Sequence, residues 1–383
     1  MQVRQATLTQ LDEHRLAPLA EIDPSLVLVF AAPRFFQDPA FPGLLGRAFP
    51  RARRLGVSTA GEISNGGVSE DSAVITALRF EGGEFSVAAT DLTGMADSHA
   101  AGRRLAEQLA GPGLKAMLLL SQGVAVNGSE LIAGALSALE RDVLLTGGLA
   151  GDNGAFARTW ALLDDRVSDR MVLALGFRGE GLRFSHGSFG GWQSFGPARR
   201  ATRAAGNVLY ELDGEPALDI YKRYLGEYAD DLPASGLLFP FAILSDSREE
   251  TGLIRTLLGI DQAEGSLTLA GDIPEGGFLK LMHASTEALV DGAEAAAHAA
   301  SGLARDKAPT LAILVSCIGR KLVMGDRVDE EVEAVAAVFG QSCALTGFYS
   351  YGEISPFLGT TECKLHNQTM TITCLSEHPP EQG

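Results

Sequence analysis

The chain has 383 residues, enough for two or three ordinary domains or for one repeated architecture. Apolar residues make up 46% of it, so a large core is available and disorder is not expected. The formal net charge of -17 disfavours nucleic acid and membranes as partners and favours a soluble protein.

The N-terminus and the cysteines indicate a cytoplasmic protein. The first residues, MQVRQATLTQLDEHRL, lack the apolar segment of a signal peptide, and no long apolar run predicts a membrane span. All four cysteines lie in the last third of the chain and form no CxxC pair, which disfavours structural zinc and covalent haem attachment. We expect reduced, mostly buried thiols, with redox sensing by Cys317 or Cys363 as the alternative.

In the first half of the chain, buried strands alternate with helices. Residues 1–24 are polar and are expected to form a loose lead-in. The apolar run SLVLVF predicts a strand buried on both faces, and Gly82-Gly83 predicts a hairpin turn. The predicted strands are 25–30, 72–80, 84–90, 116–120 and 143–146, and the predicted helices are 41–49, 97–109 and 130–139.

The second half adds a Gly- and aromatic-rich loop, GSFGGWQSFG, which carries Trp192. Gly359 with its neighbouring threonines predicts the turn before the last strand. Residues 377–383 are expected to be a disordered tail. The predicted strands are 171–177, 183–185, 208–212, 237–244, 266–270, 278–282, 310–316, 344–346 and 369–375, and the predicted helices are 216–228, 285–303 and 329–339.

A short motif occurs twice. GVSTAGEIS begins at Gly56 and GFYSYGEIS begins at Gly347, and each copy is followed by a turn and a strand. The order of strand, helix, strand and Gly-rich turn with an acid also occurs before GGLAGD, which ends at Asp152. These patterns predict an α/β fold of mixed sheets, built from duplicated βαβ units with returning strands and covered by helices.

The candidate binding residues concentrate in and around these turns. The stretch 347–375 combines four aromatic residues with a Gly-Glu pair and a His-Asn pair at a strand entrance, which predicts the wall of a ligand pocket. A carboxylate that follows a turn glycine either binds the amino group of a ligand or holds the backbone turn. The predicted ligand-binding residues are Glu62, Asp152, Trp192, Tyr349, Tyr351, Glu353 and Asn367.

Familiar catalytic and nucleotide-binding motifs are missing from the sequence. It contains no GxxxxGK[ST], GxSxG or HExxH, so we expect neither nucleotide binding nor enzymatic activity. A hydrolase or transferase that uses Cys363 and His366 is the alternative from another functional class. The face of Tyr221, Tyr224 and Tyr228 fits either the core or a subunit contact, which leaves a homodimer open.

Blocks along nearly the whole chain resemble the FIST family of sensory proteins. GVSTAGEIS and LLTGGLAGD are similar to turns of its N-terminal module, and ELDGEPALDIYKRYLG is similar to the entry of its C-terminal module. LAGDIPEGGFLKLM, GFYSYGEISP and HNQTMTITCL are similar to later blocks of that module. The resemblance implies a FIST N-terminal module over 25–213, a C-terminal module over 214–376 and a role as a sensor of small ligands.

The resemblance also implies a signalling partner. The chain contains no output domain, so a sensor of this kind acts on a separate protein. Some standalone members of the family are haemoproteins that sense nitric oxide and inhibit a histidine kinase. We therefore expect a haem-based nitric oxide sensor that regulates a histidine kinase or a cyclic-dinucleotide enzyme; a sensor of a small organic ligand such as an amino acid, without haem, is the alternative.

Haem b would need an axial ligand and an apolar cavity. His366 is the first candidate for the iron ligand because it lies in the block richest in motifs. The opposing interpretation is that His366 and Asn367 satisfy buried backbone groups at a strand start. His186 and His283 are lesser candidates, and thiolate ligation by a cysteine stays open.

Overall fold

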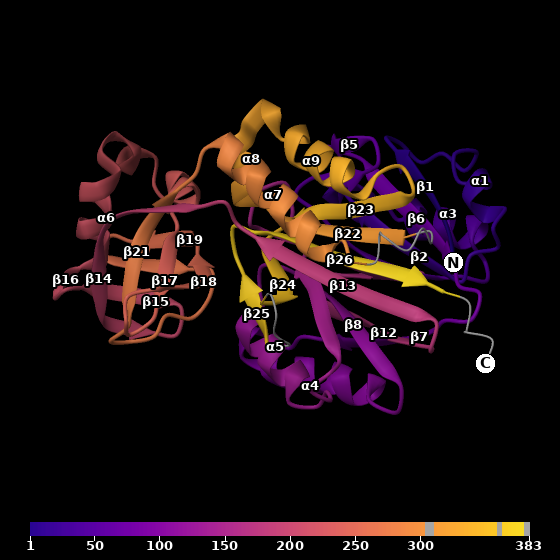
Figure 1. Ribbon diagram of the computed structural model, residues 1–383, viewed down its shortest axis with the longest axis horizontal. Coiled ribbons are helices and arrows are strands. Elements are labelled where there is room, and N and C mark those ends of the chain that lie inside the picture. Colours follow the sequence, from indigo (N-terminus) through magenta and orange to yellow (C-terminus); the bar gives the residue numbers. More distant parts are fainter. Residues whose placement is uncertain (303–309, 358–361, 379–383) are drawn as a thin grey trace.

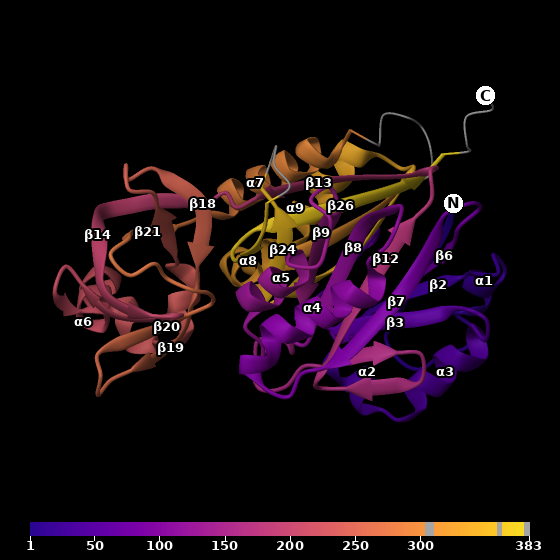
Figure 2. The same cartoon turned by 90° about the horizontal axis from the view of Figure 1, so that it is seen from below.

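The computed structural model describes residues 1–302, 310–357 and 362–378. It consists of a large core and a smaller lobe, residues 193–283, that is inserted into the chain of the core (Figure 1). The mixed α/β class predicted from the sequence is confirmed. Met1 and the C-terminal end of β26 (Met370–Glu377) lie at the side of the core away from the lobe (Figure 2).

The core contains three units of one topology. In each unit, two antiparallel strands stand beside a parallel pair, and the parallel pair is joined through helices. In sheet order, the strands are β1 (Gln2–Leu8), β6 (Ala73–Arg79), β2 (Leu26–Ala31) and β3 (Arg53–Ser58) in the first unit; β7 (Glu84–Asp91), β12 (Met171–Arg178), β8 (Leu114–Ser121) and β9 (Leu144–Leu149) in the second; and β13 (Leu182–Phe189), β26 (Met370–Glu377), β22 (Thr310–Cys317) and β23 (Cys343–Ser350) in the third. The duplication predicted from the sequence is thus a triplication.

Each unit gives a hairpin to the sheet of another unit. The hairpin β4 (Glu62–Ser64) and β5 (Gly67–Ser69) of the first unit extends the third sheet, because β4 pairs with β23. β10 (Ala161–Leu163) and β11 (Arg166–Ser168) of the second unit extend the first sheet, and β24 (Gly352–Pro356) and β25 (Cys363–His366) of the third unit extend the second. This cyclic exchange joins the three units around a pseudo-threefold axis.

A glycine recurs at one register position of the second parallel strand. Gly56, Gly147 and Gly347 stand opposite Val29, Leu119 and Leu314, respectively. A Cβ atom added to any of the three would lie within 2 Å of the carbonyl oxygen of its partner. The first glycine of each motif is therefore required by close strand packing and not by ligand chemistry.

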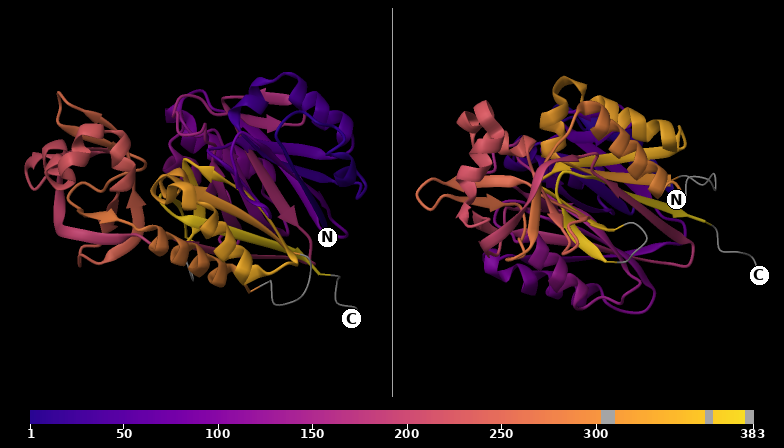
Figure 3. Two further views of the ribbon diagram at one scale, coloured as in Figure 1. Left: turned by 90° about the horizontal axis from the view of Figure 1, so that it is seen from above. Right: turned by 60° about the vertical axis from the view of Figure 1, so that its left-hand side comes forward.

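The inner faces of the three sheets share one apolar core, which includes Phe30, Leu118, Leu173, Ile313 and Phe348. Their outer faces are covered by helices (Figure 3). These helices are α1 (Ala17–Ala20), α2 (Pro33–Gln37) and α3 (Ala40–Ala48) in the first unit; α4 (Ser98–Leu109) and α5 (Gly128–Leu136) in the second; and α7 (Thr286–Ala300), α8 (Ile318–Met324) and α9 (Asp329–Phe339) in the third.

The lobe interrupts the third unit between β13 and α7 (Figure 1). Its sheet has the order β18-β17-β21-β14-β15-β20-β19 and packs against α6 (Ala217–Leu225). The strands are β14 (Gln193–Ala205), β15 (Val208–Leu212), β16 (Glu215–Pro216), β17 (Phe241–Leu244), β18 (Glu250–Arg255), β19 (Leu257–Asp261), β20 (Ser266–Leu269) and β21 (Phe278–His283). The module boundary predicted between residues 213 and 214 falls inside this sheet, between β15 and β16.

Several sequence expectations differ from the structure. Residues 1–24 are not a loose lead-in, because β1 pairs with β6 along its full length and Leu8, Leu16 and Leu19 are buried. The predicted tail begins too early, since Glu377 belongs to β26 and accepts hydrogen bonds from Glu81, Gly82 and Gly83. The turn predicted at Gly359 and the rest of the tail, residues 379–383, lie outside the described residues.

Candidate functional site

The three Gly-rich bends, which follow β3, β9 and β23, meet at the pseudo-threefold axis. Three equivalent backbone hydrogen bonds close a ring there: Ala60 N–H to Tyr349 O (2.8 Å), Tyr351 N–H to Leu149 O (3.2 Å) and Gly151 N–H to Ser58 O (2.9 Å). The bends that the sequence analysis singled out are therefore neighbours in space. They pack directly on one another and lie over the filled apolar core.

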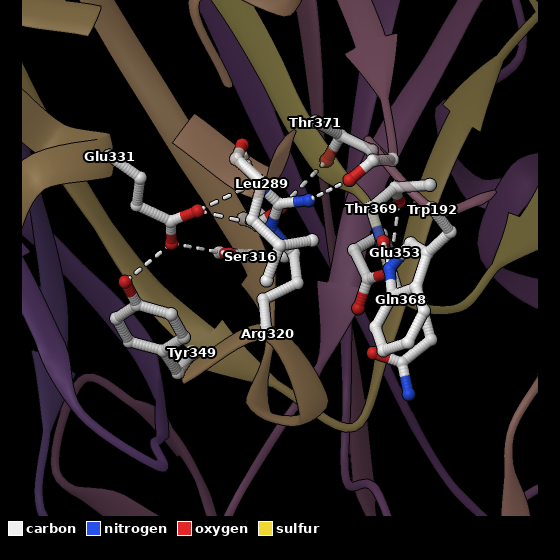
Figure 4. Close-up of polar contacts among 12 residues, drawn as sticks. Trp192, Leu289, Ser316, Arg320, Glu331, Tyr349, Glu353, Gln368, Thr369 and Thr371 are labelled. Carbon is white, nitrogen blue, oxygen red and sulfur yellow. Dashed lines mark hydrogen bonds and ion pairs between the residues drawn. The ribbon is translucent and has the colours of Figure 1, made fainter. Parts of the chain in front are cut away.

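Glu62 and Glu353 occupy matching, fully buried positions in two of the bends. Glu62 accepts hydrogen bonds from Thr59 Oγ1 and from the backbone N–H and hydroxyl of Ser72. Glu353 accepts the same set, from Ser350 Oγ and from the backbone N–H and hydroxyl of Thr369. Figure 4 shows Glu353 beside Thr369. Burial raises the pKa of Glu62 to about 7 and that of Glu353 to about 8, although these hydrogen bonds act in the opposite direction. Both carboxyl groups thus tie a bend to the strand that returns beside it.

Asp152 organises the longer loop of the second bend. Its carboxylate accepts hydrogen bonds from the backbone N–H groups of Phe156, Ala157 and Arg158, each at 2.8 Å. Tyr351 Oη donates to the same carboxylate and accepts from the N–H groups of Asp152 and Gly154. The carboxylate oxygens of this acid, like those of the two glutamates, accept their hydrogen bonds from groups of the protein itself.

The other predicted residues lie apart from one another. Tyr349 is buried and its hydroxyl donates to Glu331 at 2.5 Å. Trp192 lies where the lobe joins the core and donates its Nε1–H to Gln368 O at 2.8 Å (Figure 4). Asn367 is 1% exposed, and its Oδ1 has no hydrogen-bond partner among the described residues.

His366 is packed as a structural residue in this conformation. Its ring is 3% exposed, Nε2 lies 2.9 Å from Ser355 O, and the ring meets Phe357 edge-on at 5.1 Å. Burial lowers the pKa of His366 to about 4, which keeps the imidazole neutral. Iron coordination through Nε2 would break this hydrogen bond and would require space that the packing around the ring occupies. The residues around His366 therefore do not fit haem as they stand.

Cys363 and His366 do not form a nucleophile–base pair. Positions three apart in a strand point to opposite faces, and both residues belong to β25. Cys363 is 1% exposed, and burial raises the pKa of its thiol, which disfavours the reactive thiolate. All four cysteines are free and buried, as expected from the sequence.

A partly enclosed hollow lies between the core and the lobe. It has a volume of about 100 Å³. The core contributes Met95, Gly123, Val124, Val126, Asn127, Gly128, Leu149, Tyr351 and Leu365, and the lobe contributes Asn207, Leu258, Leu269, Ala270, Gly271 and Asp272. We call this hollow the interlobe cleft; of the seven predicted ligand-binding residues, Tyr351 alone lines it.

Asp272 is the acid of the interlobe cleft. Its carboxylate forms no ion pair with any residue in the described part of the chain. The nearby Arg255 is 5% exposed and donates to the main-chain carbonyls of Asp272 (3.1 Å) and Leu365 (3.3 Å). Burial lowers the pKa of Arg255 to about 10, yet the guanidinium stays charged at neutral pH. Arg255 thus bridges the lobe and the core behind the cleft, and its charge attracts the Asp272 carboxylate without forming a close ion pair with it in the described part of the chain.

The interlobe cleft is one of three equivalent positions around the axis. Each lies where the first parallel strand of a unit ends, beside the hairpin received from another unit. In the third unit Lys321 fills it, because its ammonium donates to Ala60 O (2.8 Å) and pairs with Glu70 (2.6 Å). In the first unit it is an open depression of about 570 Å³ along Arg158 and Trp160. The lobe covers the position of the second unit, and this makes the cleft a pocket with two walls.

Sequence reasoning missed most of this cleft. Asp272 lies in the block LAGDIPEGGFLKLM, for which the sequence indicates only a family resemblance, and Asn127 lies just before the predicted helix 130–139. Asp272 itself, an acid in a Gly-rich block, was the one feature of the sequence that could have indicated a binding residue there. Nothing local to the sequence indicates that residues 95, 127 and 272 share one cleft, because an inserted lobe brings them together.

Family comparisons agree with this architecture. The FIST N domain matches residues 25–215, and the FIST C domain matches residues 217–356. The chain belongs to the FIST family. FIST domains are sensory modules of signal transduction. In this FIST protein, the N-domain match runs from β2 of the first unit through the second unit and on to β15 of the lobe, and the C-domain match covers the rest of the lobe and the third unit from α7 to β24.

Individual relatives add little about function. An uncharacterized protein of Methanocaldococcus jannaschii is 26% identical over 216 residues, which are 52% of this chain and 40% of that protein. The chain thus matches less than half the length of this curated relative. A crystal structure of cyanuric acid hydrolase from A. caulinodans aligns with 98% of this chain and 99% of that chain at 10% identity and a TM-score of 0.36.

Within residues 1–302, 310–357 and 362–378, no three His, Cys, Asp or Glu side chains are grouped so that they could hold a metal ion. In the same part of the chain, no helix is both long and apolar enough to cross a membrane.

Proposed function

We propose that this FIST protein senses a small organic ligand with an amino group, such as an amino acid, in the interlobe cleft. The observation that carries the proposal is the Asp272 carboxylate, which lines the cleft without an ion-pair partner in the described residues. A carboxylate in a partly enclosed site gains most from a cationic ligand group. The side-chain amides of Asn127 and Asn207 supply further polar contacts from the two walls.

The size of the cleft also favours a compact ligand. A volume of about 100 Å³ corresponds to roughly three water molecules. Pockets for drug-sized molecules measure roughly 300–1,000 Å³. A porphyrin would need a larger space than this, and His366 does not line the cleft. We therefore place the organic ligand before haem and nitric oxide.

The signalling step is proposed to act in trans, in a cytoplasmic setting. The proposed output is regulation of a separate signalling protein, for which a histidine kinase or a cyclic-dinucleotide enzyme is the natural class. A ligand can drive such an output only if it binds one conformation better than another. Binding between two walls meets this condition whenever the walls move.

Thermal unfolding of the purified protein with a panel of amino acids tests the proposal. A true ligand at 100 times its dissociation constant should stabilise the fold by about 2.7 kcal/mol. Each active amino acid is compared with the matched carboxylic acid that lacks the amino group, which should not stabilise. Asp272→Asn should abolish the shift.

Glu275→Gln is the matched control, because Glu275 is an exposed acid in the same turn that does not line the cleft. If Asp272→Asn responds like Glu275→Gln, or if compounds without an amino group stabilise equally, the proposal fails. A Soret band in the visible spectrum of the purified protein, lost in His366→Ala, would instead favour haem.

A further inference from the structure

We propose that the lobe closes onto the core about a hinge at residues 190–192 and 284–285, and that contact between Met95 and Leu258 across the interlobe cleft latches the closed state. The inference rests on the proposed function for the identity of the ligand. The motion itself follows from the two walls of the cleft and from the two segments that join them.

Two exposed apolar side chains face the same cleft from opposite walls. Met95 of the core is 51% exposed and Leu258 of the lobe is 45% exposed, and both line the cleft. Large exposed apolar side chains are uncommon in the described part of this protein; the others are Phe189, Tyr228 and Leu322. Movement of the lobe toward the core would bury Met95 and Leu258 together, so the apolar effect favours closure.

The joining segment between β13 and β14 has the backbone of a hinge. Gly191 has a φ of +81°, and a Cβ atom there would lie 2.0 Å from Ala288 O. Only glycine suits this position, both because of its conformation and because of the close contact. With Gly190 before it, two consecutive residues of the segment carry no side chain that would resist a change in their backbone angles, as suits a hinge.

The core side of the hinge is clamped by a buried ion pair. Arg320 and Glu331 are both fully buried, and Arg320 Nη2 lies 2.7 Å from Glu331 Oε2 (Figure 4). Arg320 also donates to Gly190 O and to Leu289 O, which lie on the two segments that lead into and out of the lobe. Ser316 Oγ and Tyr349 Oη hold Glu331 from the other side. The pivot is therefore fixed to the core, so that any movement occurs on the lobe side of Gly190.

One hydrogen bond between the lobe and the core leaves a polar atom of the same side chain without a partner in the part of the chain that the structure describes. Gln368 Nε2 donates to Leu237 O of the lobe at 2.9 Å, but its Oε1 is buried without a partner among the described residues. Thr256 Oγ1, next to the bridging Arg255, is likewise buried and unpaired in the described part of the chain. Buried unpaired polar atoms cost free energy that water would relieve on opening. Burial of Met95 and Leu258 thus favours the closed state, and hydration of the unpaired polar atoms favours the open state. Such opposing contributions are what a two-state element requires.

Disulfide cross-linking tests the closure without any ligand. The double variant Met95→Cys with Leu258→Cys should form an intramolecular disulfide under mild oxidation, because closure brings the two Cα atoms within reach of a disulfide. The native cysteines are buried and contribute little background. The control pair, Met95→Cys with Tyr228→Cys, places the lobe cysteine at a site that is 49% exposed and outside the cleft.

We expect cross-linking at least about tenfold faster in the first pair than in the control, measured by mass spectrometry. Equal rates in the two pairs overturn the latch. The ligand-binding test can succeed or fail independently, because it measures stabilisation by a ligand through Asp272 and does not measure the motion of the lobe.

Spin labels give a second, independent measurement. Tyr228→Cys in the lobe and Leu322→Cys in the core are both about half exposed and lie outside the cleft. Electron–electron distance measurements should resolve two populations in the labelled protein. A single narrow distance overturns the hinge, even if the cysteine pair in the cleft reacts.

Discussion

The pseudo-threefold axis and the interlobe cleft differ in how their acids are satisfied. At the axis, Glu62, Asp152 and Glu353 are buried and receive three or four hydrogen bonds each from the protein. In the cleft, Asp272 has no ion-pair partner among the described residues, and Met95 and Leu258 stay exposed. The most conspicuous motifs of the sequence therefore build the fold, whereas less conspicuous residues form the surface that suits a ligand.

This difference has a physical cause. Three bends that pack on one axis need glycines for close approach and buried acceptors for their N–H groups. These needs fix residue types at fixed spacing, and such spacing resembles a binding motif. A ligand cleft needs unsatisfied groups, which carry no requirement on their neighbours in the sequence.

The largest expected effect lies in the buried ion pair. Arg320→Met leaves Glu331 buried without its cation, and removal of one partner from a buried pair costs about 3–5 kcal/mol of unfolding free energy. Arg327→Met is the matched control, since Arg327 is half exposed and pairs with Glu287 and Glu330 at the surface, where the loss is below about 1 kcal/mol. Denaturant unfolding measures both. Equal losses would mean that Arg320 is not a structural clamp.

A smaller effect is expected at Tyr351, which belongs to both regions. Tyr351→Phe keeps the ring stacked on Phe156 but leaves the N–H groups of Asp152 and Gly154 without their acceptor. The expected loss is about 1–3 kcal/mol of unfolding free energy. Tyr228→Phe, at an exposed site, should change stability by less than about 0.5 kcal/mol. If both variants behave alike, the hydroxyl of Tyr351 does not organise the second bend.

The smallest expected effect, counted as the change in unfolding free energy per pH unit, is the pH dependence that Glu353 contributes. Burial raises its pKa from 4.5 to about 8, so between these values the folded form binds more protons than the unfolded form. Stability should therefore fall as pH rises through this window, by at most about 1.4 kcal/mol per pH unit from this group. Glu353→Gln should flatten the profile between pH 6 and 7, measured by denaturant unfolding.

Glu333→Gln is the control for this profile, because Glu333 is an exposed glutamate of α9. It should keep the slope of the unsubstituted protein. A Glu353→Gln profile as steep as that of Glu333→Gln would show that the Glu353 carboxyl titrates as it does in the unfolded chain.

Sequence reasoning worked best where the signal was local. The run SLVLVF predicted β2, and the predicted helix 130–139 overlaps α5, whose N-cap residue Asn127 accepts a hydrogen bond from Glu130 N–H. It failed where pairing is remote. β4 pairs with β23, almost 300 residues away in the sequence, and no pattern in EIS specifies that partner.

The third bend was recognised only in part for a similar reason. GGLAGD shares the glycine that packs on Leu119, but a loop that Asp152 holds in place separates it from its hairpin. Because of this inserted loop, the third copy of the repeat is difficult to recognise in the sequence. The strand register identifies the third copy, because Gly56, Gly147 and Gly347 stand at one equivalent position in three sheets.

By itself, the sequence determined the α/β class, the FIST resemblance and the glycines and acids of the bends, because these depend on spacing within a few residues. The tertiary structure decided that there are three units, that they exchange hairpins, and that residues 95, 127 and 272 share one cleft. Strand exchange and insertion of the lobe place side chains together through contacts between distant segments, and such contacts leave no periodic trace along the chain.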